Sequence, residues 1–496
     1  MQTIERLANQ IEGAAVFGRG DVVPAGLAYD SKRVEPGDLF VCWRGERFDG
    51  HAFADEAVAK GAVALLCERR LAHLDHVPQI VVPNSRAAMG KIAAALYGNP
   101  SERLRLIGVT GTNGKTTSTY LIKAILEAAG HRVGLIGTIQ HLIGDQPVRA
   151  ARTTPEAPEV QGLLAAMAAQ GCSFCVMEVS SHGIALQRIE GCRFAYGLFT
   201  NLTHDHLDYH GTFEAYRDTK ASFFRLLREG GAINLDDPSA PYFRAAAAGV
   251  PIIGYGMERP DAEVSARNVR VEPSGVTYAA ITPLGTIDVA LRLTGEFNVY
   301  NSLGAIAVAI QAGVPKEAIA AGLANVQVPG RFERIDCGQP FTVIVDYAHT
   351  PDGLANVLRT ARQLTSGRVI AVFGAGGDRD RAKRPQMGRV GAAWADWLII
   401  TADNPRSEDP WVICEEIRLG VKEAGFPLEK APIIVDRRRA IREAIAMAKD
   451  GDVILIAGKG HETYQEFHDR IIPFDDRAEA VRALEERFGS AQVFSG

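Results

Sequence analysis

Long apolar runs are missing from the sequence. The longest, such as residues 453–457, have the length of a strand, whereas a membrane-spanning helix needs ~18 apolar residues. We therefore expect no insertion into a membrane. Near the first residue, Glu5 and Arg6 stand where a secretory signal would have its apolar segment, so we also expect no export and a cytoplasmic location.

Cysteine is scarce as well. The 496 residues include 7 cysteines, scattered along the chain and odd in number. That count fits reduced thiols and argues against a disulfide framework. Cys172 and Cys175 have CxxC spacing, but no second pair follows to complete a zinc site. We expect both to be buried structural cysteines.

An excess of basic charge is also absent. The chain has 54 Lys and Arg against 59 Asp and Glu, a net charge of -5, so we expect no broad positive surface for nucleic acid. Hydrophobic residues make up 47% and charged residues 23%, which is typical of a globular protein and excludes disorder. At ~150 residues per domain, the chain should form about three domains.

Changes in the hydrophobic pattern divide the chain into blocks covering residues 1–100, 101–330 and 331–496. Asn-Pro and Pro-Gly dipeptides, which are typical of turns, mark the two boundaries. Strands alternate with helices, so the predicted fold class is α/β with mainly parallel sheets. We expect a smaller N-terminal α/β domain, a central P-loop domain that is richer in strands over residues 231–294, and a C-terminal doubly wound, Rossmann-like domain.

The sharpest local signal is GVTGTNGKTT, residues 108–117, between a predicted strand and a predicted helix. Glycines let backbone N–H groups close around phosphate oxygens, and the helix N-terminus adds positive potential. Lys115 can then reach the β and γ phosphates, and the Thr116 hydroxyl can ligate magnesium. The Walker consensus requires glycine where this sequence has Val109, so the match is imperfect. The alternative is a glycine-rich turn with a chance Gly-Lys-Thr.

Polar residues follow two further predicted strands of the central block. Glu178 ends one strand, and residues 201–206 follow the next. A carboxylate and an imidazole beside nucleotide phosphates suggest a second divalent cation. The alternative is a hydrogen-bonded polar loop, and His204 and His210 default to structural roles. Lys220 lies in a helical pattern that by itself indicates a solvated surface lysine.

Three loops in the third block follow parallel strands, at residues 376–381, 403–406 and 458–462. Their glycines do not match GxGxxG, so a dinucleotide site is poorly supported. The arginines suggest clamps for carboxylate or phosphate, because a guanidinium grips both oxygens at once. Surface ion pairs are the alternative for any one of these loops.

Together these motifs resemble the Mur ligase family, the ATP-dependent amide-forming enzymes of peptidoglycan assembly. The segments that carry the resemblance fall in the family's order: YDSKRVEPGDLFV, GVTGTNGKTT, MEVSSH, TNLTHDHLDYHGT, GEFNVYN, VDYAHTPD, GGDRDRAKRP, DNPR and GKGHE. They span essentially the whole chain, and the family's own nucleotide loop accounts for Val109. The resemblance implies a monomeric ligase that adds meso-2,6-diaminopimelate to UDP-N-acetylmuramoyl-L-alanyl-D-glutamate through an acyl phosphate.

The resemblance also implies roles for individual residues. For ATP the matching positions are Gly111, Thr112, Asn113, Gly114, Lys115, Thr116, Thr117, Asn301, Asp346 and His349. For the UDP-linked substrate they are Ser31, Glu46, Arg47, Phe48, Thr153, Thr154, Ser180 and Arg188. For diaminopimelate they are Arg379, Asp403, Asn404, Pro405, Arg406, Gly458 and Glu462. For two magnesium ions they are Thr116, Glu178, His206 and Lys220, with Lys220 carrying a carbamate derived from carbon dioxide. Lys115, Lys220 and His206 are the catalytic positions.

Arg406 is our candidate for amino-acid selection. Diaminopimelate has a second carboxylate that lysine lacks, and a guanidinium suits that anion, while Pro405 stiffens the loop. The alternative is that Arg406 anchors its own loop to Glu408 or Asp409.

Other functions remain open at this point. The same type of ligase could use L-lysine, or the chain could be a ligase like folylpolyglutamate synthetase, although the DNPR loop and the Ser31 segment argue against the latter. A rival of another class is a non-enzymatic nucleotide switch, which would have no need of arginine clamps in a third domain.

Overall fold

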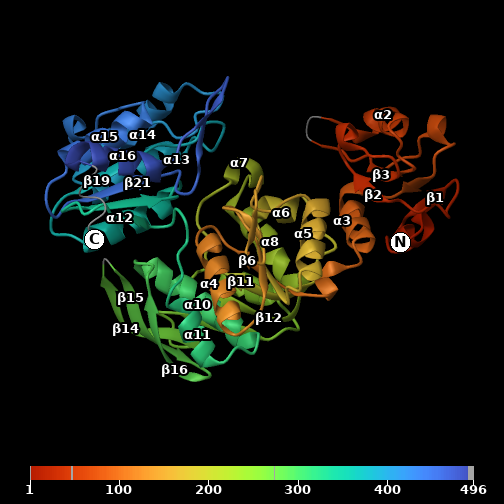
Figure 1. The fold of residues 1–496 in the computed structure, drawn as a ribbon, viewed down its shortest axis with the longest axis horizontal. Helices are drawn as coiled ribbons and strands as arrows, with labels where there is room; N and C mark the ends of the chain where they lie inside the picture. The colour runs from red at the N-terminus through yellow and green to blue at the C-terminus, as the bar shows by residue number, and fades with distance from the viewer. Residues whose placement is uncertain (1, 46–47, 273, 490–496) are drawn as a thin grey trace.

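The computed structural model describes residues 2–45, 48–272 and 274–489 of the chain. These residues form three successive units, each built around its own sheet (Figure 1). In Figure 1 the first unit is red, the second runs from orange to green, and the third runs from teal to blue. The central unit lies between the other two, and the predicted mixed α/β class is confirmed.

The N-terminal unit has a five-stranded sheet in the order β1-β5-β4-β3-β2, with β1 antiparallel to β5 and the other pairs parallel. Its strands are β1 (Ala15–Phe17), β2 (Gly26–Ala28), β3 (Asp38–Val41), β4 (Ala64–Cys67) and β5 (Gln79–Val81). Its helices are α1 (Ile4–Ala8), α2 (Ala54–Ala59) and α3 (Ser85–Leu96). Helices α1 and α3 pack on one face of the sheet and α2 on the other, so the unit has two apolar layers.

The central unit has an eleven-stranded sheet in the order β16-β15-β14-β13-β12-β11-β6-β10-β7-β8-β9. The parallel part of the sheet consists of β6, β7 and β10 to β14. Antiparallel strands extend the sheet at both of its edges. The core strands are β6 (Arg105–Thr110), β7 (Val133–Ile136), β10 (Phe174–Glu178), β11 (Phe194–Phe199), β12 (Leu227–Asn234) and β13 (Ile252–Gly256). The end strands are β8 (His141–Ile143), β9 (Gln146–Val148), β14 (Val264–Glu272), β15 (Gly275–Thr282) and β16 (Gly285–Leu291). The strand-rich stretch expected over residues 231–294 is thus present.

Helices cover both faces of this sheet. One face carries α4 (Lys115–Ala128), α10 (Glu296–Gln311) and α11 (Lys316–Leu323). The other carries α5 (Ala157–Ala169), α8 (Phe213–Ser222) and α9 (Ala240–Ala246), while α6 (Ser181–Ala185) and α7 (Leu207–His210) are short. Strands covered on both faces are mainly apolar and buried along their whole length, as β10 and β11 are. Close packing also makes Gly108 of β6 necessary, since a Cβ there would lie 2.3 Å from the Phe223 ring.

The C-terminal unit has a five-stranded sheet in the order β17-β18-β21-β19-β20, parallel except for β17. Its strands are β17 (Glu333–Ile335), β18 (Thr342–Asp346), β19 (Val369–Phe373), β20 (Trp397–Ile400) and β21 (Val453–Ala457), with a separate hairpin of β22 (Tyr464–Glu466) and β23 (Ile471–Pro473). Helices α12 (Pro351–Gln363), α13 (Lys383–Trp394) and α14 (Pro410–Glu423) cover one face. Helices α15 (Arg437–Met447) and α16 (Asp476–Phe488) cover the other, which is the doubly wound arrangement predicted.

Two expectations about composition can be checked here. All seven cysteines are free, and Cys172 and Cys175 are buried, as predicted. Within the described ranges, no helix combines the length and apolar character needed to span a bilayer.

Candidate active site

A cavity of about 910 Å³ lies between the central and C-terminal units, where the parallel strands of both sheets end. Loops that follow β6, β10 and β11 line it from the central unit, and loops that follow β18 to β21 line it from the C-terminal unit. The candidate residues in its lining are Thr112, Asn113, Gly114, Lys115, Thr116, Thr117, Thr153, Glu178, Ser180, Arg188, His206, Asn301, Asp346, His349, Arg379, Asp403, Asn404, Arg406, Gly458 and Glu462. Candidates from two sheets thus share one cavity.

The phosphate loop joins β6 to α4, and its glycines leave no room for side chains. Gly111 has a φ of 147°, and a Cβ there would lie 1.9 Å from Thr200 Oγ1. Gly114 has a φ of 83°, and its Cβ would lie 2.2 Å from Asn301 Oδ1. Asn301, on α10, therefore lies directly against the loop, which explains why a segment almost 190 residues downstream belongs to this site.

Lys115 is folded over the loop that precedes it. Its Nζ donates to the carbonyl oxygens of Gly111 at 2.9 Å and Thr112 at 2.8 Å. Burial lowers the pKa of the Lys115 ammonium, and the carboxylates of Glu178 and Asp205 oppose that shift. A phosphate bound in the loop would therefore lie close to the Lys115 side chain, which lines the cavity.

Glu178 ends β10 and lies at the centre of a polar cluster. Its Oε1 accepts from Thr116 Oγ1 at 3.0 Å, and its two oxygens accept from the Thr138 N–H and hydroxyl at 2.9 Å each. Arg331 Nη2 donates to Thr116 Oγ1 at 3.0 Å. The carboxylate and the hydroxyl are oxygen donors of the kind that magnesium prefers. Among the described residues, no group of three or more His, Cys, Asp or Glu side chains could hold a metal by itself.

His206 adopts a left-handed backbone conformation, with a φ of 55°, at the start of α7. Its ring packs edge-on against that of His182, 4.8 Å away, and its Nε2 lies 3.3 Å from Asp205 Oδ2. Burial lowers the pKa of His206 to about 3 although Asp205 raises it, so the ring is neutral and a nitrogen lone pair is available. His204 Nε2 lies 3.5 Å from Asp380 Oδ2 of the C-terminal unit.

Lys220 corrects the expectation of a surface lysine. Its side chain, on α8, is 1% exposed, and Nζ donates to the carbonyl oxygen of Gly111 at 2.7 Å. Burial, and then the charge of Lys115, lower the pKa of Lys220 well below its ordinary value. Lys220 shares the buried face of α8 with Tyr216 and Ala221, and this face lies against the phosphate loop.

Two more candidates for nucleotide contact lie at the carboxyl end of β18 and in the loop that follows it. Asp346 accepts from the backbone N–H groups of Phe332 at 2.6 Å and Ala348 at 2.7 Å, and burial raises its pKa. His349 has its Nδ1 2.9 Å from the Tyr347 carbonyl oxygen, and burial lowers its pKa to about 4. Both side chains line the cavity on the side of the C-terminal unit.

The loops after β20 and β21 are joined by Lys459, which sequence reasoning missed. Its Nζ donates to Asn404 Oδ1 at 2.9 Å and Glu462 Oε2 at 3.0 Å, and lies 3.7 Å from Asp403 Oδ1. Gly458 has a φ of 120°, and a Cβ there would lie 2.5 Å from Asp403 Oδ2. Lys459 therefore holds together three of the residues expected to bind an amino acid.

Arg406 lines the cavity, and two nitrogens of its guanidinium already donate hydrogen bonds within the protein. Its Nε donates to Glu466 Oε2 at 3.0 Å and its Nη1 to the Gly377 carbonyl oxygen at 2.7 Å. The anchoring alternative named the wrong carboxylates, because Glu408 pairs with Arg384 at 2.8 Å. Pro405 is outside the cavity lining, and its carbonyl oxygen packs against Gly377, 1.9 Å from where a Cβ would be.

The residues expected to bind the muramoyl dipeptide are linked to one another. Thr154 Oγ1 donates to the Glu178 carbonyl oxygen at 2.8 Å and accepts from the Ser180 N–H at 3.1 Å. Arg188 Nη1 donates to the Thr154 carbonyl oxygen at 3.2 Å. Thr153 Oγ1 lies 3.0 Å from Thr138 Oγ1.

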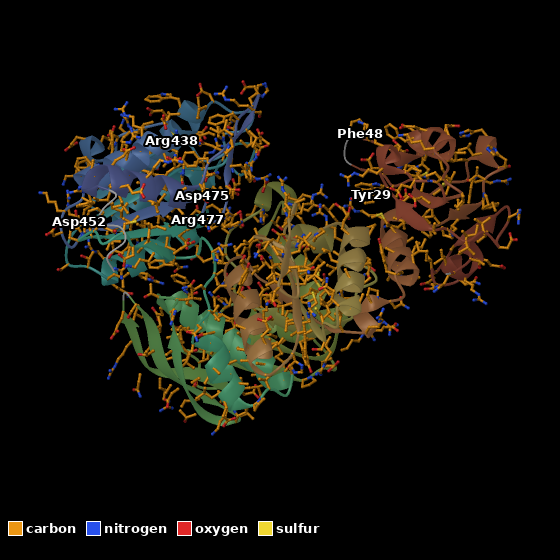
Figure 2. The ribbon with its side chains drawn as sticks, viewed as in Figure 1. Tyr29, Phe48, Arg438, Asp452, Asp475 and Arg477 are labelled. Carbon is orange, nitrogen blue, oxygen red and sulfur yellow. The ribbon has the colours of Figure 1, made fainter. Side chains whose placement is uncertain are left out.

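The candidates for the uridine end lie in the N-terminal unit, apart from the cavity. Ser31 is buried and donates to Glu56 Oε2 at 3.0 Å. Phe48 is 70% exposed, and Figure 2 places it on the edge of the N-terminal unit that faces the other two units. Glu46 and Arg47 are outside the described residues.

Models of known families match most of the chain. The Mur ligase family catalytic-domain model matches residues 25–97, the Mur ligase middle-domain model residues 109–309, and the Mur ligase glutamate-ligase-domain model residues 330–460. A Geobacillus thermodenitrificans protein named UDP-N-acetylmuramoyl-L-alanyl-D-glutamate–2,6-diaminopimelate ligase is 46% identical over 493 residues, which cover 98% of this chain and 99% of that protein. The chain belongs to the Mur ligase family.

Further relatives agree with this assignment to the Mur ligases. A Geobacillus kaustophilus protein of the same name is 48% identical over 490 residues, covering 97% of this chain and 99% of its own length. A solved structure of a ligase of that name superposes with a TM-score of 0.70 at 33% identity, covering 98% and 99% of the two chains. A MurF ligase from Thermotoga maritima in complex with ADP has the same fold, with a TM-score of 0.63 at 20% identity and coverage of 96% and 99%.

Proposed function

We propose that this Mur ligase adds meso-2,6-diaminopimelate to UDP-N-acetylmuramoyl-L-alanyl-D-glutamate and converts ATP to ADP and phosphate. The observation that carries the proposal is the cavity, which the phosphate loop lines from one sheet and the loop of Asp403 to Arg406 from another. The relatives that share 46% and 48% of their residues with this chain over nearly their full length are named for the same reaction.

The reaction we propose has two steps. A carboxylate of the D-glutamate residue attacks the γ-phosphorus of ATP, and ADP leaves as an acyl phosphate forms. The amine of diaminopimelate then attacks the acyl carbon, and phosphate leaves from the tetrahedral intermediate with formation of the amide. Lys115 and Arg331 both donate hydrogen bonds to residues of the phosphate loop, and they would stabilise the charge on the transferring group.

The ATP site in this proposal consists of the loop and three neighbouring segments. The loop residues Gly111 to Thr117 would bind the phosphates through backbone N–H groups and Lys115. Asn301, Asp346 and His349 would contact the adenosine end, since all three line the cavity beside the loop.

Magnesium fits the oxygen donors next to the loop. Thr116 would hold one ion, and Glu178 with His206 a second, while phosphate oxygens complete each shell. When bound, magnesium neutralises developing phosphate charge and aligns the reacting oxygens. The Thr138 donors orient Glu178 for this task.

Lys220 would take part as a carbamate. Burial favours the neutral amine, whose nitrogen lone pair can attack carbon dioxide and release one proton. The amine is thereby converted to an anion that would lie beside magnesium, and catalysis would depend on that negative charge.

The other substrates would occupy the two remaining sides of the site. The UDP-linked substrate would contact Ser31, Glu46, Arg47 and Phe48 in the N-terminal unit and Thr153, Thr154, Ser180 and Arg188 in the central unit. Diaminopimelate would contact Arg379, Asp403, Asn404, Arg406, Gly458 and Glu462, and Pro405 would stiffen the loop that carries Arg406. Here arginines suit the carboxylates of the amino acid, and Asp403 and Glu462 suit an ammonium group.

We also propose domains over residues 1–100, 101–330 and 331–496, a cytoplasmic location and a monomeric state. The family models support these boundaries, because one match ends at residue 97 and another begins at residue 330.

The deciding experiment is a phosphate-release assay with ATP, magnesium, UDP-N-acetylmuramoyl-L-alanyl-D-glutamate and a panel of amino acids. We expect release only with meso-diaminopimelate, together with a product heavier by one residue in mass spectrometry. Release with L-lysine at an equal rate would contradict the assignment of the amino acid. Nucleotide binding without any amino-acid-dependent turnover would instead support a switch.

A further inference from the structure

One buried carboxylate of the central unit has three arginine partners. Glu156, directly before α5, is 4% exposed. Its Oε2 accepts from Arg86 Nη2 at 2.8 Å, its Oε1 accepts from Arg152 Nη1 at 2.6 Å, and Arg188 Nε lies 2.9 Å from the same Oε1. We call these four residues the Glu156 cluster.

The Glu156 cluster crosses between two units. Arg86 belongs to α3 of the N-terminal unit, and the other three residues belong to the central unit. Arg86 also donates from Nε to the Leu186 carbonyl oxygen at 2.7 Å, and its guanidinium carbon lies 4.2 Å from the centre of the Trp43 ring. Trp43 follows β3 and begins the segment that leads to Phe48. Arg86 therefore contacts Trp43 in the N-terminal unit and Leu186 and Glu156 in the central unit.

The cluster also reaches the cavity. Arg152 and Arg188 both line it, next to Thr153 and Ser180. One carboxylate faces three guanidinium groups, so the cluster has two positive charges in excess. An excess of that sign at the cavity wall suits a substrate that carries a diphosphate and carboxylates.

We propose that Glu156 is a positioning residue for the UDP-linked substrate. Its carboxylate orients the Arg152 and Arg188 side chains toward the cavity and binds Arg86 of the N-terminal unit. The distance between the parts of the N-terminal and central units that bind this substrate is therefore fixed before the substrate binds. The chemical identity of the substrate rests on the proposed function, whereas the role of Glu156 requires only a nucleotide-linked anion that spans both units. Binding of ATP and of the amino acid does not depend on this cluster.

The test combines equilibrium binding with steady-state kinetics on the full-length protein. Kd for UDP-N-acetylmuramoyl-L-alanyl-D-glutamate is measured by calorimetry without ATP or amino acid, and KM is measured for all three substrates. We expect Glu156→Gln to raise Kd and KM for the UDP-linked substrate about tenfold, the loss typical of a charge-assisted hydrogen bond. KM for ATP and for diaminopimelate should stay within about twofold, and Glu156→Asp should recover part of the affinity.

Glu159→Gln is the matched control. Glu159 lies one turn further along α5 and accepts a hydrogen bond from Tyr29 of the N-terminal unit, but it is not in the arginine cluster. We expect Glu159→Gln to change Kd for the UDP-linked substrate by less than about twofold. This result would distinguish a positioning role of Glu156 from a general effect of losing a contact between the two units. Arg86→Lys provides a variant outside the central core, because lysine cannot reach both acceptors, and it should raise the same Kd several-fold.

Three results would overturn the proposal. They are an unchanged Kd in Glu156→Gln and Arg86→Lys, a parallel rise of KM for all three substrates, and a lower Kd in Glu156→Gln, which would mean that the carboxylate only neutralises charge. If Glu156→Gln does not fold, Arg86→Lys and Glu156→Asp decide the question. Wild-type protein that binds the UDP-linked substrate but uses lysine would contradict the proposed function and leave the role of Glu156 intact.

Discussion

Asn113 of the phosphate loop donates from Nδ2 to Asp352 Oδ2, at the start of α12 in the C-terminal unit, over 2.8 Å. The contact spans 239 residues of sequence and joins the loop after β6 to the helix after β18. Thr350 caps that helix by accepting from the Gly353 N–H at 3.1 Å, and so fixes where Asp352 lies. The nucleotide loop and the C-terminal unit are thereby linked by a direct polar contact at the cavity wall.

The first prediction tests that contact. Asp352→Ala removes the acceptor, so we expect kcat/KM for ATP to fall about tenfold, as for loss of a hydrogen bond to a charged group. Asp352→Asn keeps an oxygen acceptor and should lose less than about threefold. Equal losses in the two variants would mean that the negative charge, rather than the hydrogen bond to Asn113, is the important property.

Lys220 gives a prediction about covalent chemistry. With ¹³C-labelled bicarbonate, we expect the wild-type protein to show a carbamate carbon signal in NMR that is absent in Lys220→Arg, whose guanidinium does not react in this way. We expect Lys220→Ala to lose at least about 10²-fold in kcat with bicarbonate present or depleted, because the anion beside magnesium is gone. A variant that keeps full activity in both conditions, or a wild type without the signal, contradicts the assignment.

Arg406 gives a prediction about amino-acid choice. In wild type we expect a preference for meso-diaminopimelate over L-lysine of about 10⁴-fold, because lysine lacks the carboxylate that the Arg406 guanidinium would bind. Arg406→Ala should reduce kcat/KM for diaminopimelate and leave the poor use of lysine unchanged. Arg381→Ala is the control, since Arg381 lies in the same loop cluster and pairs with Glu408 at 2.8 Å on the protein surface. Similar effects of the two substitutions would rule out a specific role for Arg406.

Glu408 gives a prediction about pH. The hydrogen bond from Arg384 lowers the pKa of Glu408 to about 2, against the opposing effect of burial. A carboxylate with a depressed folded pKa stabilises the protein above its unfolded pKa of ~4.3, and that contribution is lost as pH falls toward 2. We expect Glu408→Gln to lower the free energy of unfolding by about 1–2 kcal/mol at pH 7, with a difference from wild type that shrinks below pH 4.

Urea denaturation between pH 3 and pH 8 measures that difference. Glu415→Gln is the control, because the Glu415 carboxylate meets Arg418 at a longer distance of 3.4 Å. We expect its effect to stay below about 0.5 kcal/mol throughout. A difference for Glu408→Gln that is constant with pH would contradict the role given to its ionised form.

Local patterns were enough to predict much of the fold and one half of the site. The unit of β6, phosphate loop and α4 follows from an apolar run, glycines and a helical period, all adjacent in sequence. Loops after β19, β20 and β21 could be placed on one edge because parallel strands share their carboxyl ends.

Residues whose roles depend on packing between distant segments were harder to predict. Lys220 looked like a surface residue because lysine is usually solvated, and a helical period does not show that the face it shares with Tyr216 lies beneath a loop. Arg406 and Glu466 are 60 residues apart, and their pairing depends on how the β22–β23 hairpin folds back. The only local feature that pointed to Arg331 was its position directly after Pro329 and Gly330, at the predicted domain boundary. A periodic pattern cannot show that its side chain reaches Thr116.

Arg331 lies in the stretch of backbone that joins the central sheet to the C-terminal sheet, and its guanidinium lies 3.0 Å from Thr116 Oγ1. Gly330, beside it, is pressed against the C-terminal unit, since a Cβ there would lie 2.1 Å from the backbone nitrogen of His461. A rotation of the C-terminal unit about this segment would change the distance between the Arg331 guanidinium and Thr116 Oγ1. We therefore expect that a separation of the two units would also move a cation away from the phosphate loop.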